Sequence, residues 1–260
     1  MKCSKRVYKA YSGVGRGFSL IELLVVIALV SALVAILLPA LRLARLWSKR
    51  VNCQANLRQI TQAWHMYFND NDGRFYQGIN ADVEFVGWRG LANPDHPRPL
   101  NKYLSLSETP ETEGQAAVAR CPADTGDDWT AGLSVYTING TSYRTNLLMI
   151  GPTQIPALPD PGLTEGVNRR LPSLRMQDTA GHSRLLLVGD CGWVNQWWPG
   201  SGDEDGWHGR PRSFNLAFMD GHTAFVPIRK GVYVANEYTV IPFQELYGLA
   251  RDAQRQGSSE

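Results

Sequence analysis

The 260-residue sequence has little excess charge, few cysteines and no evident internal repeat. Its net charge of +2 at pH 7 leaves no strongly basic footprint, so we predict no nucleic-acid partner. No glycine-rich phosphate loop occurs, and no Ser-His-Asp or Cys-His arrangement has a recognisable sequence context. We therefore predict that the protein is not an enzyme and that it holds no cofactor.

What the sequence does contain is one long hydrophobic run. It extends from Gly17 to Leu41 and carries a single charge, Glu22. A helix of this length can cross the roughly 30 Å hydrocarbon core of a bilayer. Because a carboxylate in lipid costs a few kcal/mol or more, we expect Glu22 to have a functional partner. Pro39 lacks a backbone N–H and should kink the helix.

A short leader precedes the run. Residues 1–17 hold five basic side chains and no acidic one, as the charged region of a secretory signal does. The apolar run is too long for the core of a removed signal, however, and no small-x-small cleavage site closes it. An ordinary secretory signal is therefore disfavoured.

The segment around Gly17 resembles the class III signal of type IV pilin-like proteins, the pilins and the type II secretion pseudopilins. The resemblance rests on Gly17, Phe18, Glu22 and Pro39 at their positions in the run. It implies that a prepilin peptidase cleaves between Gly17 and Phe18 and methylates the new amine of Phe18. It also implies assembly into a filament, in which Glu22 would pair with the Phe18 amine of a neighbouring subunit.

Beyond Pro39 the helix should continue to about residue 70. Apolar residues recur there at steps of three and four, which is the spacing of one helical face. The residues of this face are Cys53, Leu57, Ile60, Trp64 and Tyr67. Arg58, Gln59 and Gln62 point elsewhere, so this half should pack on a sheet and end near Gly73, a glycine suited to a left-handed cap.

The cysteines allow two interpretations. Cys3 would be lost with the leader, and the three that remain permit one disulfide. A Cys53–Cys121 bridge would pin the globular part to the helix in an oxidising compartment. Alternatively, the cysteines are buried free thiols.

Strand signals recur in the second half of the chain. The strongest is a hairpin of residues 213–219 and 222–228, with alternating apolar residues and an Asp220-Gly221 turn. A second hairpin, residues 134–138 and 143–150, is predicted around Asn139-Gly140. The other predicted elements are short strands at 83–88 and 184–188, a short helix or turn at 101–104, a loop at 151–168 and a short helix at 243–251.

Sparse landmarks in the chain resemble a narrower group, the large pilin-like proteins of planctomycetes, verrucomicrobia and lentisphaerae with a His-x9-Asp-Gly motif. The landmarks are Cys53-x-x-Asn56-Leu57-Arg58-Gln59-Ile60, Cys121-Pro122, the segment 186–190, and His208 ahead of Asp220-Gly221. His208 precedes Asp220 by two residues more than that spacing. The departure indicates a longer loop and weakens the transfer of any role to His208.

Two further groups of residues could carry chemistry. Asp190, His208, Asp220 and His222 could bind zinc if they converged, but their spacing has no recognised ligand register, so we predict structural roles and no metal. A second group could form an aromatic platform for glycan or a partner, or could fold onto the sheet. It consists of Trp193, Trp197, Trp198 and Trp207, near the acidic residues Asp203, Glu204 and Asp205.

The predicted fold is α+β and pilin-like, with a long N-terminal helix packed on an antiparallel sheet. We divide the chain into a leader (1–17), a transmembrane half-helix (18–41), an amphipathic half-helix (42–70) and an extracytoplasmic globular domain (71–260).

The predicted function is a structural pseudopilin-like or minor-pilin-like subunit of a type II secretion or type IV pilus-like filament. It would be a single-pass protein of the inner membrane, with its globular domain in the periplasm or in a cell-surface filament. Its partners would be a prepilin peptidase, other pilin or pseudopilin subunits, an inner-membrane assembly platform and the lipid bilayer. The alternative is a membrane-anchored module that binds polysaccharide or another ligand.

Overall fold

The computed structural model describes residues 19–78, 80–92, 94–150, 155, 158–197 and 206–257. Contacts divide the chain into two units, the first ending at Ala44 and the second running from Arg45 to Glu260. The α-helices are α1 (Leu20–Asp70), α2 (Val135–Asn139), α3 (Pro161–Arg170) and α4 (Tyr247–Gly257). The strands are β1 (Tyr143–Thr145), β2 (Leu186–Asp190), β3 (Ser213–Phe218) and β4 (Thr223–Pro227).

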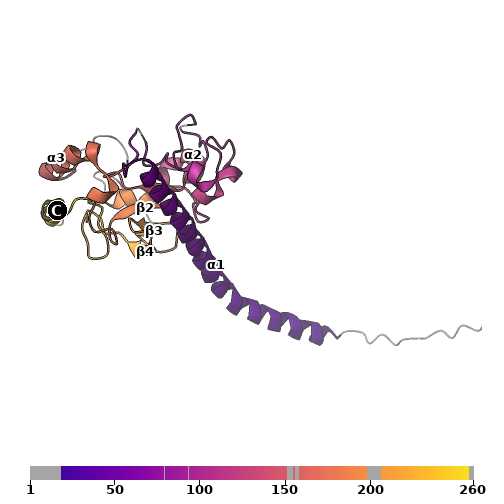
Figure 1. The fold of residues 1–260 in the computed structure, drawn as a ribbon. Helices are drawn as coiled ribbons and strands as arrows, with labels where there is room; N and C mark the ends of the chain where they lie inside the picture. The colour runs from indigo at the N-terminus through magenta and orange to yellow at the C-terminus, as the bar shows by residue number, and fades with distance from the viewer. Residues whose placement is uncertain are drawn as a thin grey trace, which may run out of the picture. The chain divides into compact units, whose positions relative to one another are not determined.

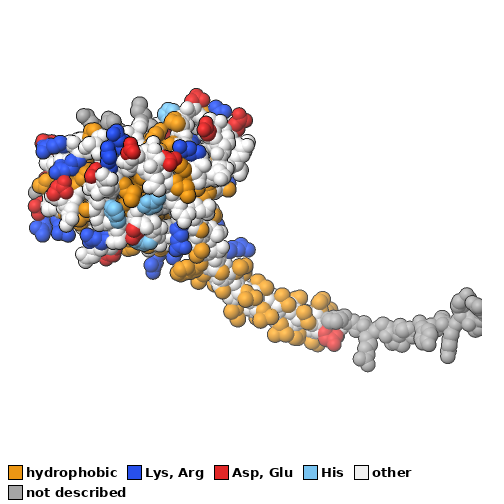
Figure 2. All heavy atoms as spheres, viewed as in Figure 1, with side chains coloured by type: hydrophobic (Ala, Val, Ile, Leu, Met, Phe, Trp, Pro, Cys, Tyr) orange, Lys and Arg blue, Asp and Glu red, His pale blue; other side chains and the backbone are white. Residues whose placement is uncertain are grey.

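In the first unit, the described residues belong almost entirely to the N-terminal part of α1. Its most apolar 18-residue window has a mean hydropathy of 3.0, and none of that window is buried. Within the described part of the chain, this is the one helix long and apolar enough to cross a membrane. The helix continues through Pro39, and Figure 2 shows apolar side chains along this stretch.

In the second unit, α1 supplies one wall of the hydrophobic core. Its buried residues are Cys53, Leu57, Ile60, Thr61, Ala63, Trp64 and Phe68. Tyr67 is half-buried, whereas Arg58, Gln59 and Gln62 are exposed. The predicted amphipathic face is therefore confirmed. The predicted stop is also confirmed, because Gly73 has φ 76° and donates its N–H to the Phe68 carbonyl over 2.7 Å.

The four strands form one antiparallel sheet in the order β1-β2-β3-β4. The C-terminal part of α1 packs against this sheet (Figure 1), so the α+β prediction is confirmed. Arg58 Nε donates to Thr223 Oγ1 over 3.0 Å, and the Arg50 guanidinium lies 3.7 Å from the ring centre of Phe225. Both contacts join α1 to β4.

The β3–β4 hairpin was predicted correctly. Ser213 pairs with Pro227 at one end and Ala217 with Thr223 at the other. Gly221 takes a φ of 92° in the turn, a backbone conformation that glycine adopts at little cost. All six residues of β3 are buried, whereas the alternation of its apolar residues predicts a strand with only one buried face.

The hairpin predicted at 134–138 and 143–150 is wrong. The first segment forms the short helix α2, because Ser134 caps its N-terminus by accepting the Thr137 N–H over 3.1 Å. Gly140 ends α2 in the left-handed conformation with φ 83°. The Asn139-Gly140 pair thus closes a helix, and β1 pairs with β2.

The strand predicted at 83–88 is also absent from the structure. Most of this segment is buried, but it is irregular. Asn101 takes the place of a strand neighbour: its Oδ1 accepts the Gly87 N–H over 2.9 Å and its Nδ2 donates to the Gly87 carbonyl over 2.8 Å. Gly87 has φ 114°, and its backbone lies too close to the Gly140 carbonyl to admit a side chain.

The remaining predictions need smaller corrections. The loop predicted at 151–168 contains most of α3, which begins at Pro161 after Asp160 caps it through the Leu163 N–H over 2.6 Å. The strand predicted at 184–188 lies at 186–190 as β2. The short helices predicted at 101–104 and 243–251 are confirmed, the latter as a 3₁₀ turn followed by α4.

Candidate functional site

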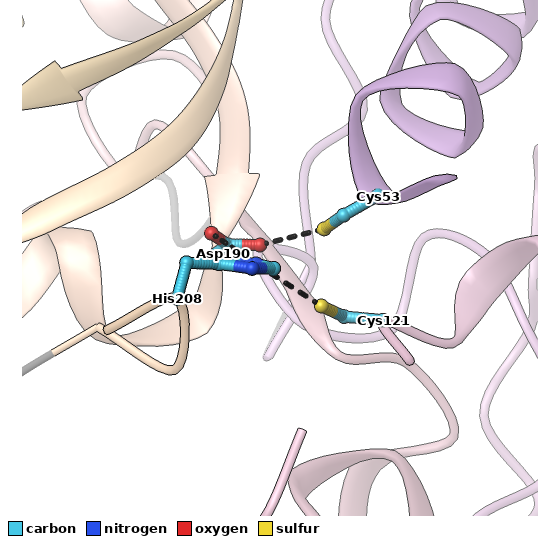
Figure 3. A group of neighbouring side chains, drawn as sticks. All are labelled: Cys53, Cys121, Asp190 and His208. Carbon is cyan, nitrogen blue, oxygen red and sulfur yellow. Dashed lines mark hydrogen bonds and ion pairs between the residues drawn. The ribbon is translucent and has the colours of Figure 1, made fainter. Parts of the chain in front are cut away.

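The second unit contains a buried group of four chemically versatile side chains. Cys53, Cys121, Asp190 and His208 each offer one ligand atom, and these atoms all lie within 4.8 Å of one another. Figure 3 shows the four side chains directed toward a common point. All four residues are almost completely shielded from solvent. We call this group the Cys–Cys–Asp–His cluster.

Three close contacts join the cluster. Cys53 Sγ lies 2.9 Å from Asp190 Oδ1, and Cys121 Sγ lies 3.4 Å from His208 Nε2. His208 Nε2 is also 3.4 Å from Asp190 Oδ2. The other ring nitrogen, His208 Nδ1, is buried with no hydrogen-bond partner among the described residues. The ring therefore engages its surroundings through the nitrogen that faces the cluster.

Each member of the cluster comes from a different segment. Cys53 is on α1 and Asp190 is the last residue of β2. Cys121 lies in a loop, where its N–H donates to Ser142 Oγ over 3.0 Å. His208 precedes β3, and its carbonyl accepts a hydrogen bond from the Arg50 guanidinium over 3.0 Å. The four segments are distant in sequence, so only the tertiary fold brings them together.

The glycine at position 189 allows β2 to lie close to β3, which positions Asp190 in the cluster. A Cβ there would lie 2.3 Å from Leu216 Cδ2 and 2.9 Å from the Asn215 carbonyl oxygen on β3. The close approach places Asp190 Oδ2 where it accepts the Asn215 N–H over 2.7 Å. This bond fixes one carboxylate oxygen and leaves the other toward Cys53.

Burial and close contacts perturb the acid–base properties of the cluster. Burial raises the pKa of the Cys53 thiol well above its usual value. Burial lowers the pKa of His208, but its contacts with Asp190 and Cys121 outweigh that effect and raise the pKa to about 9. The contacts with Asp190 and Cys121 therefore favour the protonated imidazole of His208.

A tyrosine contacts the Cys53 sulfur, and an asparagine contacts that tyrosine. Tyr143 Oη lies 3.4 Å from Cys53 Sγ, opposite Asp190 in the β1–β2 register. The amide Nδ2 of Asn56 donates to the same Tyr143 oxygen over 3.3 Å. The Cys53 thiol can donate to the tyrosine oxygen, and the tyrosine O–H can donate to the sulfur when Cys53 is a thiolate.

Near the N-terminus, Glu22 forms a hydrogen bond in the first turn of α1. The Ser19 backbone N–H donates to Glu22 Oε2 over 2.9 Å. A carboxylate in the first turn satisfies free N–H groups and interacts favourably with the helix dipole. Gly17 and Phe18, the predicted cleavage and methylation positions, lie outside the described residues.

The N-terminal part of α1 exposes large apolar side chains. Leu20 is 81% exposed and Ile36 is 73% exposed. Apolar surface on this scale marks contact with a membrane or another protein. This exposed apolar surface follows Glu22 at the start of the helix. The sequence predicts the same order of one acidic residue and a long apolar run.

Residues 15–38 match the family model of the prokaryotic N-terminal methylation motif. The match spans Gly17, Phe18 and Glu22, and with the apolar helix it is consistent with a pilin-like prepilin signal that a peptidase processes. The methylation motif ends one residue before Pro39. No curated protein and no solved structure matches the chain.

Outside the methylation motif, the structure groups the candidate residues differently from the sequence prediction. Of the four acid–base candidates, Asp190 and His208 come together, whereas His222 and Asp220 lie elsewhere and contact each other at 2.6 Å on the surface. Cys53 and Cys121, predicted as a possible pair, join the first two. The structure has both as free thiols, and their disulfide stays a prediction.

Two tryptophans of the predicted aromatic platform do not lie at the surface. Trp193 and Trp197 are buried, which agrees with the alternative that these rings fold onto the sheet. Trp207 is half-buried and donates its Nε1–H to Asp127 Oδ1 over 3.1 Å. Trp198 and the acidic residues at 203–205 lie outside the described residues.

Proposed function

We propose that this protein is a structural subunit, pseudopilin-like or minor-pilin-like, of a type II secretion or type IV pilus-like filament. The observation that carries the proposal is the methylation motif at residues 15–38, which covers the start of α1, where the most apolar part of the helix has no buried residue. In this role the chain performs no catalysis. Its work is to present a helix to neighbouring subunits and a globular domain to its surroundings.

The surface of α1 supports two successive states of the subunit, first inserted in the membrane and then assembled in the filament. Exposing apolar area to water costs roughly 25 cal/mol per Å², so the N-terminal half needs a lipid environment before assembly. The second unit, with its polar surface and buried core, would lie in the periplasm. In the filament, α1 helices of neighbouring subunits would replace lipid around one another, with an inner-membrane platform and prepilin peptidase as the partners of that process.

Glu22 supports the assembly step. In a single chain its carboxylate accepts the Ser19 N–H at the start of α1. Cleavage after Gly17 would create a new amine at Phe18, next to that turn. The same amine on a neighbouring subunit is a cation for Glu22, and the pair would compensate the cost of a carboxylate in lipid.

The assembly role is tested by Glu22→Leu in the full chain in its native cell. We expect cleavage and membrane insertion to persist and incorporation into sheared filaments or into crosslinked subunit ladders to fall at least tenfold. Glu108→Leu, which changes an exposed glutamate of the second unit, is the matched control and should assemble normally. Normal incorporation of Glu22→Leu would refute the proposed role of Glu22.

Processing is tested separately by Gly17→Trp. We expect an uncut precursor on an immunoblot, because the resemblance implies a peptidase pocket that accepts only a very small residue. Gly13→Trp, the same change within the leader, should still yield mature protein. The N-terminal peptide of the natural protein should begin with N-methylated Phe18. A mature product that begins at Met1 would overturn the pilin-like function.

A further inference from the structure

We propose that Cys53, Cys121, Asp190 and His208 bind one zinc ion, which fastens α1 to the sheet in the second unit. This site goes beyond the filament function, which the methylation motif carries, and it rests on the geometry of the buried cluster alone. Its ligands would be two thiolates, one imidazole nitrogen and one carboxylate oxygen.

The spacing of the cluster fits tetrahedral coordination. Zinc bonds of about 2.3 Å to sulfur and about 2.0–2.1 Å to nitrogen or oxygen predict separations of about 3.6 Å between sulfur and nitrogen and about 3.4 Å between nitrogen and oxygen. The observed distance from Cys121 Sγ to His208 Nε2 is 3.4 Å, and the four ligand atoms, one from each residue, all lie within 4.8 Å of one another. The Cys53 Sγ to Asp190 Oδ1 distance of 2.9 Å is shorter, and a small rotation of either side chain would open it.

The donor set selects the metal. Thiolate and imidazole ligands in a tetrahedral arrangement suit zinc, whereas magnesium and calcium prefer six or more oxygen ligands. Four protein ligands complete the coordination of zinc and leave no position for water or substrate. With Cys53 and His208 almost completely buried, the site is closed, which is typical of structural zinc.

The surroundings supply the contacts that a zinc site needs. The Tyr143 hydroxyl, whose oxygen already accepts from Asn56, can donate to the Cys53 sulfur. The Asn215 N–H holds the second oxygen of Asp190. Hydrogen bonds of this kind orient the ligands and tune the metal. The Arg50 guanidinium, bonded to the His208 carbonyl, places a positive charge beside a site whose three anionic ligands exceed the charge of zinc.

A zinc ion here would link four segments that are distant in sequence: α1, the Cys121 loop, the end of β2 and the turn before β3. Because metal binding to such a site is coupled to folding, zinc would hold the outer half of α1 on the sheet. A Cys53–Cys121 disulfide would fasten the helix as well, but it would consume both thiolates. The two states therefore exclude each other, and a single set of measurements separates them.

The first test measures metal in the full-length protein, purified in detergent without chelator, both with and without a thiol reductant. Elemental mass spectrometry should find about one zinc per chain, as expected for a closed four-ligand site. Cys121→Ser and His208→Ala should lower the zinc content at least fivefold. Cys191→Ser and His222→Gln change a buried cysteine and a histidine outside the cluster, and both should keep the wild-type zinc content.

The second test needs no substitution, so it remains decisive if the cluster variants fail to fold. Wild-type protein stripped with a chelator is titrated with Co²⁺. We expect the visible bands of tetrahedral Co²⁺ and thiolate-to-metal charge transfer that saturate at about one equivalent. Added zinc should abolish both signals and raise the thermal midpoint of the stripped protein, as any ligand specific for the folded state does.

The results that would overturn the proposal are equally specific. One is a Cys53–Cys121 disulfide in peptides from protein isolated from its native envelope. Another is a zinc content far below one per chain together with no thiolate-to-Co²⁺ signal. Unchanged zinc in a folded Cys121→Ser variant would also overturn it. None of these results bears on cleavage at Gly17 or on filament assembly, so the two proposals fail independently.

Discussion

Replacing Leu57 by alanine tests whether the outer half of α1 is a fixed part of the second unit's core. Leu57 is fully buried, one turn after Cys53 on the face that meets the core. The lost side-chain carbons account for roughly 2.4 kcal/mol at about 0.8 kcal/mol per buried CH₂. The cavity left behind adds to this, for a total of about 2–5 kcal/mol.

The assay is urea unfolding of the full chain in a constant detergent background, followed by tryptophan fluorescence. With an m-value of about 3 kcal/mol/M, a loss of about 3 kcal/mol moves the midpoint down by about 1 M. Met66→Ala is the matched control, because Met66 lies on the same helix but is 50% exposed. Its effect should stay within about 0.5 kcal/mol.

The outcome is decided by the difference between the two variants. If Leu57→Ala shifts the midpoint no more than Met66→Ala does, then α1 is not packed into the core beyond Arg45. The helix would in that case be a tether, and the cluster built on Cys53 would lose its geometric basis.

Further substitutions probe the elements around the cluster. Gly189→Ala should cost about 1–3 kcal/mol, because its Cβ would meet the Asn215 carbonyl at 2.9 Å. Gly114→Ala, where a Cβ meets nothing within 4 Å, should stay within about 0.5 kcal/mol in the same urea assay; equal effects would contradict the close β2–β3 approach. Asp160→Ala should remove the cap of α3 and cost about 1 kcal/mol, lowering the thermal midpoint by about 2–4 °C. An unchanged midpoint for Asp160→Ala would mean that the bond to the Leu163 N–H contributes nothing.

The elements that sequence reasoning predicted correctly are those specified by local pattern. In β3, Phe214, Leu216 and Phe218 alternate with polar or small residues. The Asp220-Gly221 turn follows, so both signals lie within a few residues. The outer half of α1 shows its buried face at helical spacing. The failures arise where one signal has two meanings: Asn139-Gly140 is a good hairpin turn, but Ser134 five residues earlier makes the same glycine a helix cap.

The Cys–Cys–Asp–His cluster shows the limit of that reasoning. The sequence singled out Cys53 with Cys121 and, separately, Asp190 with His208, so all four members were recognised as residues of interest. Nothing in their spacing indicates that the two pairs meet, because the ligand atoms are brought within 4.8 Å by packing among α1, β2 and two loops. A convergence of this kind depends on the tertiary fold and has no local sequence signal.

The participation of α1 in the core has a practical consequence for anyone who wants the globular part free of its membrane anchor. A shortened chain that starts at residue 71 would omit Leu57, Trp64 and Cys53, and the exposed interior would invite aggregation. A chain that starts near Arg45 lacks the apolar N-terminal part of α1 but retains Arg50 and every buried residue of the helix. A soluble variant should therefore be truncated inside α1, well before the residue at which the helix ends.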